Sequence, residues 1–237
     1  MNFKIFFLES YSFHRLKRVK PFSLVELFML LIFISIISTL FIPTLGRARK
    51  EAKTSLCINN MRRIGIAIAA YSCQFNNQYP PWISSLNPAF LPSQDLYHCP
   101  FDANPPNTKP YQWISHPEQK FQEAYDRPKP KGFIYPQGNK RWNSEVIKVS
   151  YFYEFTDSVC SLVNPQDNKL SWNMVKTYSL NHGKNKYTNV PFKNDIDHFP
   201  ILRCFWHLRY KNVEPVINIS PEGNSFYSTL TWEKSTW

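Results

Sequence analysis

The residues best suited to chemistry in this 237-residue chain are cysteines and histidines that lie beyond residue 76. The pairs His98-Cys99 and Cys204-x-x-His207 offer four ligands of the kinds that zinc binds. Outside the reducing cytoplasm cysteines also form disulfides, so the same residues support a second interpretation. Because neither half of the set is a C-x-x-C pair, we predict a disulfide between Cys99 and Cys204. A zinc site made of His98, Cys99, Cys204 and His207 is the alternative.

The other cysteines are constrained by the elements expected to carry them. Cys57 and Cys73 are 16 residues apart on one expected helix, which separates them by about 24 Å at 1.5 Å per residue. A disulfide needs Cα atoms within about 7 Å of each other. We therefore exclude a bond between these two residues within one chain, and assign Cys160 to the same globular part as Cys99 and Cys204.

Sequence motifs of enzymes do not occur in the chain. It contains no G-x-S-x-G elbow, no H-E-x-x-H pair and no Gly-rich phosphate loop, and it has only 6 glycines in all. His182 and Asp157 are of the types that act as acid and base, but their spacing does not indicate a shared site. We therefore predict no enzymatic activity and no cofactor.

Basic residues exceed acidic ones, with 28 Lys+Arg against 17 Asp+Glu and a formal charge of +11. Five of the basic residues precede one apolar stretch, and six more follow it between residues 47 and 63. Cations beside a membrane gain about 1 kcal/mol each from anionic headgroups. The sequence has no zinc-finger spacing or helix-turn-helix signature. We therefore predict a membrane as partner and no specific nucleic acid.

The apolar stretch covers residues 22–45, which are 24 residues, and a bilayer core needs about 20 residues of helix. Leu, Ile and Phe occur on every face, so no polar side is left for water. The stretch is longer than the roughly 7–15 apolar residues of a cleaved secretory signal, and no A-x-A site closes it. We predict one membrane-spanning helix, with the N-terminus inside and the rest of the chain outside the cytoplasmic membrane.

Glu26 is the one ionisable residue in this apolar stretch. An ionisable group in a membrane span is costly unless it is solvated or finds a partner. Two interpretations stay open: Glu26 lies in water at the headgroup level, or it pairs with a cation at the start of the helix. Cleavage of the chain before Phe22 would create such a cation, a new α-amino group, to which Glu26 of a neighbouring copy could bind.

Residues 20–81 resemble the N-terminal segment of type IV pilins and type II secretion pseudopilins. The resemblance rests on a basic leader, an apolar helix with Pro43 near its end, a basic amphipathic continuation, and the run Phe22-Ser23-Leu24-Val25-Glu26-Leu27. It implies a pilin-like structural subunit that assembles with like or related subunits into a type II secretion pseudopilus or a type IV pilus-like filament. It also implies that Glu26 guides subunit docking.

In that family a prepilin peptidase removes the leader, which here means cleavage between Pro21 and Phe22, and methylates the new N-terminal residue, Phe22. The family normally has Gly where this chain has Pro21, and Pro fixes φ and lacks an N–H. A chain that kept its leader would be a simple signal anchor. Major pseudopilins bind calcium in a C-terminal loop, and the best candidates for such ligands here are Asp195 and Asp197.

The apolar helix is expected to continue beyond the membrane. No Pro occurs in residues 46–75, and apolar residues recur at spacings of 4, 3, 4, 3 and 4, which is the pattern of an amphipathic helix. They are Cys57, Met61, Ile64, Ile68, Tyr71 and Phe75. We expect one helix over residues 22–75 with this stripe against a sheet, and a bend or loosening at Pro43 and Gly46.

The C-terminal part is rich in Pro and aromatic residues, and its candidate strands are residues 145–155, 176–180, 201–208, 216–220 and 225–232. Pro221 and Gly223 suit the second and fourth positions of a hairpin turn between the last two. We predict an α+β, pilin-like fold whose long helix packs by its second half on a small antiparallel sheet in a loop-rich head. The expected segments are a leader (1–21), a membrane helix (22–45), an amphipathic helix (46–76) and the head (77–237).

The aromatic content of the head supports a different function. The chain has 7 Trp and 13 Tyr, and aromatic faces suit sugar rings, although aromatic side chains also fill protein cores. The alternative to a filament subunit is therefore a monomeric, signal-anchored surface protein whose head binds a ligand such as a carbohydrate.

Overall fold

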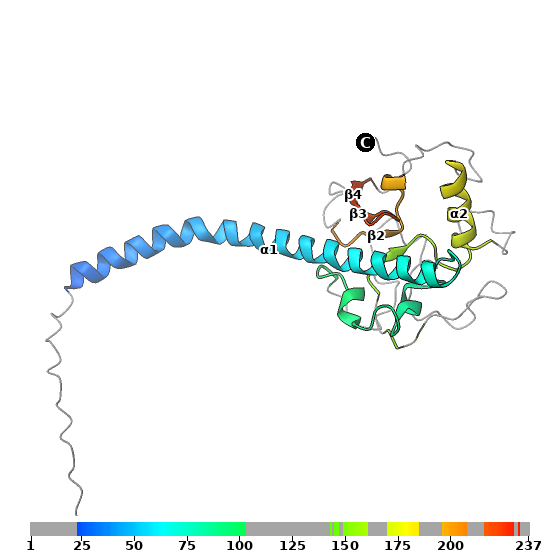
Figure 1. The fold of residues 1–237 in the computed structure, drawn as a ribbon. Helices are drawn as coiled ribbons and strands as arrows, with labels where there is room; N and C mark the ends of the chain where they lie inside the picture. Colours follow the sequence, from blue (N-terminus) through cyan, green and yellow to red (C-terminus); the bar gives the residue numbers. More distant parts are fainter. Residues whose placement is uncertain are drawn as a thin grey trace, which may run out of the picture. The chain divides into compact units, whose positions relative to one another are not determined.

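The computed structural model describes residues 23–102, 143, 145–146, 149–160, 170–184, 196–207, 216–229 and 232, with the side chains of 40–43 left aside. The chain divides into two compact units, Met1–Ala48 and Arg49–Trp237. The elements (Figure 1) are, in chain order, α1 (Leu24–Gln74), η1 (Ile83–Leu86), η2 (Gln94–Tyr97), β1 (Phe152–Tyr153), α2 (Trp172–His182), η5 (Ile196–His198), β2 (Leu202–Cys204), β3 (Val216–Ile219) and β4 (Ser225–Ser228).

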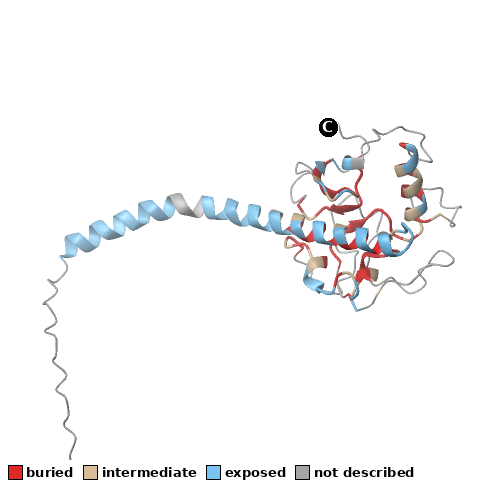
Figure 2. Ribbon diagram, in the orientation of Figure 1, coloured by how far each residue is buried: buried red, intermediate tan, exposed pale blue. Residues whose placement is uncertain are grey.

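Within the first unit, the described side chains of α1 are exposed on every face (Figure 2). Among the described residues, α1 is the one helix long and apolar enough to cross a membrane. Its polar side chains are satisfied within the helix, because Ser35, Ser38 and Thr39 each donate to a backbone carbonyl one turn earlier. A helix whose exposed side chains are mostly apolar, and whose hydroxyl groups bond to its own backbone, has the properties required in lipid.

The part of α1 within the second unit is amphipathic, as the sequence predicts. Cys57, Met61, Ile64, Ile68 and Tyr71 are buried in the main core. The last residue of the predicted stripe, Phe75, is largely exposed but stacks on Tyr71 with ring centroids 4.3 Å apart. The helical assignment runs without interruption through Pro43 and Gly46, so the predicted single helix is confirmed.

A glycine on this helix allows close approach to the sheet. A Cβ on Gly65 would lie 3.4 Å from the Ile219 Cγ2 atom on β3. A methyl group here would just touch Ile219, so a larger side chain would have to displace it, while Ile64 and Ile68 fill the core beside it.

The sheet has four antiparallel strands in the order β1-β2-β3-β4. Ile217 and Ile219 of β3 belong to the main core with α1, whereas Val216 belongs to a second cluster with Trp172 and Val175 of α2. This alternation follows from the period of two along a strand. The short sheet therefore contributes side chains to two cores, one shared with α1 and one shared with α2.

The predicted hairpin between β3 and β4 is confirmed. The Gly223 N–H donates to the Ser220 carbonyl at 2.9 Å, which places Pro221 and Gly223 at the second and fourth turn positions. Gly223 has φ of 85°, a region that favours glycine because it has no Cβ. Strand β4 ends at Ser228, earlier than predicted.

The strand predicted at residues 176–180 is wrong, because these residues form the middle of α2. Ser171 caps the helix by accepting a hydrogen bond from the Met174 N–H at 3.3 Å, and Gly183 ends it in the left-handed conformation. A serine cap and a terminal glycine are ordinary helix boundary signals. They outweigh the apparent strand pattern between them.

The strand predicted at residues 145–155 is much shorter, and among its described residues only Phe152 and Tyr153 pair with β2. The Glu154 N–H still donates to the Ile201 carbonyl beside β2, but further out the Ser150 N–H donates to the Tyr97 carbonyl and the Asp157 N–H donates to the Pro81 carbonyl. Because the N–H groups of Ser150 and Asp157 bond outside the sheet, the ladder cannot extend along the segment.

A buried ionic cluster joins the sheet to α2. Glu154 lies 2.9 Å from the Lys176 Nζ and 3.4 Å from the Arg203 Nη1. The Arg203 Nε also donates to the Asn218 Oδ1 at 3.1 Å. All of these side chains are buried, so each charge depends on its partners for the interactions that water would otherwise supply.

The aromatic residues of the described head are mostly internal. Trp82, Trp172 and Trp232 are buried, and Trp206 is half-buried with its indole N–H donating to the Ser150 carbonyl at 2.9 Å. These residues fill the core, which accounts for a large part of the aromatic content without a ligand.

Candidate functional site

Four buried side chains converge in the main core, three cysteines and one histidine. Cys57 comes from α1, Cys99 follows η2, Cys204 is the last residue of β2, and His207 is three residues further on. The sulfur atom of Cys57 is 3.5 Å from that of Cys204 and 3.6 Å from that of Cys99. The sulfur atoms of Cys99 and Cys204 are 3.6 Å apart.

The imidazole of His207 completes the group. Its Nε2 lies 3.8 Å from the Cys99 Sγ, and its ring lies against Phe101 with centroids 4.5 Å apart. The four ligand atoms all lie within 4.8 Å of one another. We call Cys57, Cys99, Cys204 and His207 the Cys3His cluster.

Local hydrogen bonds explain how Cys99 reaches this position. The side chains of Asn60 on α1 and of Tyr151 both donate to the His98 carbonyl, each at 3.2 Å. The Ser150 N–H donates to the Tyr97 carbonyl at 2.9 Å. The backbone on either side of residue 98 is therefore tied to α1 and to the segment before β1, which directs the Cys99 side chain into the core.

The sequence singled out three members of this cluster and missed the fourth. Cys99, Cys204 and His207 come together as the zinc alternative requires. Cys57 takes the fourth position, whereas the His98 carbonyl accepts hydrogen bonds from the side chains of Asn60 and Tyr151. The missed indication was the position of Cys57 on the buried stripe of α1, which directs its sulfur toward the sheet.

The predicted disulfide between Cys99 and Cys204 joins two residues that the structure places side by side. In the structure Cys57, Cys73, Cys99, Cys160 and Cys204 are all free thiols. The Cys99–Cys204 disulfide therefore stays a prediction. Its formation would leave Cys57 as an unpaired thiol beside it.

The electrostatics of the cluster differ from one sulfur to the next. Hydrogen bonds with Cys204 and Cys57 lower the pKa of Cys99, and burial opposes this shift. Burial raises the pKa of Cys204 far above its usual value. The hydrogen bond with Cys204 lowers the pKa of Cys57, but the hydrogen bond with Cys99, burial and the charge of Cys99 together raise it by more. Cys99 is the sulfur that holds negative charge most readily.

The chemistry open to this arrangement follows from its donors and its burial. Three thiols and an imidazole are the ligand types of structural zinc sites, and a set of four protein ligands leaves no position for a substrate. Within the described part of the chain, it is the one group of at least three Cys, His, Asp or Glu side chains close enough to share an ion. The arrangement suits a structural ion rather than catalysis.

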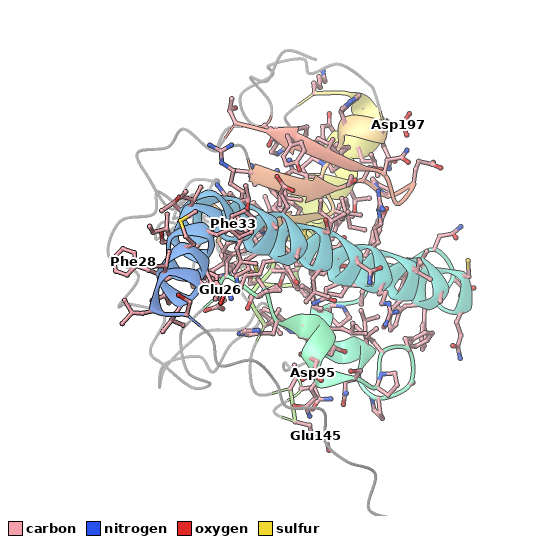
Figure 3. All side chains as sticks on the ribbon, turned by 90° about the vertical axis from the view of Figure 1, so that its left-hand side faces the viewer. Glu26, Phe28, Phe33, Asp95, Glu145 and Asp197 are labelled. Atoms are coloured by element: carbon pink, nitrogen blue, oxygen red, sulfur yellow. The ribbon has the colours of Figure 1, made fainter. Side chains whose placement is uncertain are left out.

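Glu26 lies in the exposed first turn of α1, and Figure 3 labels it on the same helix as Phe28 and Phe33. The Ser23 N–H donates to the Glu26 Oε2 at 3.0 Å. Ser23 precedes the first helical residue and Glu26 is the third residue of the helix, so this contact is one half of a capping box. The S-x-x-E spacing in the sequence is the signature that predicts it.

The remaining predicted sites are distributed as follows. Pro21, Phe22 and Asp195 lie outside the described residues. Asp197, in η5, accepts a hydrogen bond from the Asn224 Nδ2 at 2.8 Å. His182 ends α2, where its Nδ1 bonds to the Tyr178 carbonyl at 2.9 Å. Burial raises the pKa of the Asp157 carboxyl.

Comparisons of this chain with protein-family models, with curated proteins and with solved structures found no match.

Proposed function

We propose that this protein is a pilin-like structural subunit, stored in the cytoplasmic membrane and assembled into a filament through the first part of α1. The observation that supports this most is the surface of residues 24–39, which is apolar and exposed on every face. A helix with no polar face needs lipid or other helices around it. Storage in a bilayer and packing in a filament supply these two environments in turn.

The position of Glu26 supports the second step of this proposal. It is the one acidic residue in the first turn of α1, and a carboxylate within an apolar assembly needs a compensating charge. Removal of residues 1–21 would provide that charge as the α-amino group of Phe22. Glu26 of one subunit then pairs with this amine of a neighbour, which sets the axial position of the two subunits.

The capping contact of Glu26 makes a sharp test available. A Glu26→Gln variant keeps an oxygen that accepts the Ser23 N–H but loses the charge, whereas Glu26→Ala loses both. Cross-linking in intact membranes of the producing cell should give a ladder of homo- or hetero-oligomers for the natural chain and monomer for both variants. Membrane insertion, measured in parallel, should be unchanged in both.

Two outcomes would contradict the proposal. A ladder retained by Glu26→Gln but lost by Glu26→Ala would show that the residue acts as a helix cap and not as a charged docking group. Monomer alone from the natural chain would favour the signal-anchored, ligand-binding alternative. The intact mass of the purified protein reports whether the chain begins at Phe22, which the proposed ion pair requires.

A further inference from the structure

From the Cys3His cluster we infer that this protein binds one zinc ion, through the thiolates of Cys57, Cys99 and Cys204 and the Nε2 of His207. The ion is structural and fastens α1 to the sheet and to the loop after η2. This inference is independent of the proposed function, because all four ligands lie in the second compact unit, Arg49–Trp237.

The spacing of the sulfur atoms supports zinc. With Zn–S bonds of about 2.3 Å, tetrahedral geometry places the sulfur atoms about 3.8 Å apart. The three sulfur–sulfur distances are 3.5, 3.6 and 3.6 Å, so small outward shifts admit an ion at the centre. A disulfide needs about 2.05 Å and joins two sulfur atoms, whereas here three are equally close to one another.

The histidine separates a metal site from an ordinary apolar cluster of thiols. Buried cysteines pack as small hydrophobic side chains, but a buried imidazole needs a polar partner. His207 is buried and its Nε2 lies 3.8 Å from the Cys99 sulfur, a distance at which a hydrogen bond to sulfur is weak. A zinc–nitrogen bond of about 2.0–2.1 Å gives the same nitrogen a strong partner.

The origin of the ligands indicates what the ion does. Cys57 and Cys204 are 147 positions apart in the sequence, and Cys57 and Cys99 are 42 apart. A single ion therefore closes two long loops and adds to the apolar packing and the Asn60–His98 hydrogen bond that already join these elements. A filled site with four protein ligands keeps the thiols coordinated, so it also protects them from oxidation in an oxidising compartment.

The test begins with the full chain, purified in detergent without chelators. Metal analysis should give about one zinc per chain, and the thiol count after denaturation should be five because the chain has 5 Cys. X-ray absorption at the zinc edge should show about three sulfur atoms at 2.3 Å and one nitrogen at about 2.0–2.1 Å. This measurement needs no variant, so it is unaffected by changes in folding.

Variants then identify the ligands. Loss of an outer-shell partner already lowers metal affinity by about 10–100-fold, so Cys57→Ser, Cys204→Ser and His207→Ala, which each remove a ligand, should each lower zinc affinity by at least about tenfold. Cys160→Ser is the matched control, because Cys160 is also a buried cysteine but belongs to the second core cluster, and it should keep its zinc. Cys73→Ser, at an exposed position of α1, should keep it too.

Three results would overturn the inference. One is a chain with five reduced thiols that takes up no zinc from a zinc-supplemented buffer. Another is a zinc shell dominated by oxygen, which would indicate surface binding. The third is a Cys99–Cys204 disulfide found in the protein as isolated, because a disulfide and zinc cannot share these sulfur atoms.

Discussion

The part of helix α1 in the first compact unit and the part in the second carry similar apolar side chains, but these differ in how far they are exposed. In the first part the Ile34 side chain is 50% exposed, and the large apolar side chains around it on the helix are exposed as well. In the second part Ile64 is fully buried, while Ile66, two positions further on, is 68% exposed. Isoleucine therefore occurs on one helix in an apolar stretch exposed on all sides, in the buried stripe, and on the exposed face opposite that stripe. What each isoleucine contributes depends on the part and the face of the helix that carry it.

This difference explains how one helix serves two purposes. A stretch that is apolar all round has no preferred side, so it suits any apolar surroundings that a membrane or a set of helices offers. A stretch with one apolar stripe has a preferred side and orients itself against a specific core. Substitutions that act on one part and spare the other test this distinction.

The largest effect is expected from charges in the first part. The double variant Ile32→Arg with Ile36→Arg places two cations near the centre of the apolar stretch, at a cost of about 3 kcal/mol each. The inserted fraction, measured by alkaline carbonate extraction, should fall sharply. The matched control is Leu56→Arg with Ile66→Arg, at two exposed positions of the second part, and it should remain inserted. Equal insertion of both variants would contradict the assignment of the span.

A smaller effect is expected from a cavity in the second part. Ile64→Ala removes a fully buried side chain, and such truncations reduce the free energy of unfolding by about 2–5 kcal/mol. Denaturant unfolding of the detergent-solubilised protein should show this loss, with membrane insertion unchanged. Ile66→Ala, on the exposed face, should change stability by no more than about 0.5 kcal/mol. Similar losses from both would mean that the stripe does not face the core.

The smallest effect is expected where the helix approaches the sheet. Gly65→Leu must fit a side chain against Ile219, and overpacking of this kind costs about 1–3 kcal/mol of stability. Gly46→Ala meets nothing within 4 Å, so it should cost nothing and gain up to about 1 kcal/mol in helix propensity. Thermal unfolding of the two variants measures the difference, and a stabilising Gly65→Leu would show that the helix does not pack closely at this point.

Predictions from sequence succeeded where a local pattern was enough. The long helix follows from an apolar run and the stripe after it, and the β3–β4 hairpin follows from Pro221 and Gly223. They failed at α2, where residues 176–180 were predicted as a strand although Ser171 and Gly183 mark helix boundaries. They also overestimated β1, because the residues around it use their N–H groups in contacts with distant loops.

The sequence alone determined which side chains are available for chemistry and where the apolar helix lies, because both depend on residue types and short spacings. Only the tertiary structure decided that Cys57 and not His98 joins Cys99, Cys204 and His207. It likewise paired Glu154 with Lys176 and Arg203 from separate elements. Such contacts join residues that are tens of positions apart, and in the case of Cys57 and Cys204, 147 positions apart. They depend on how helices and strands pack, which no short-range pattern encodes.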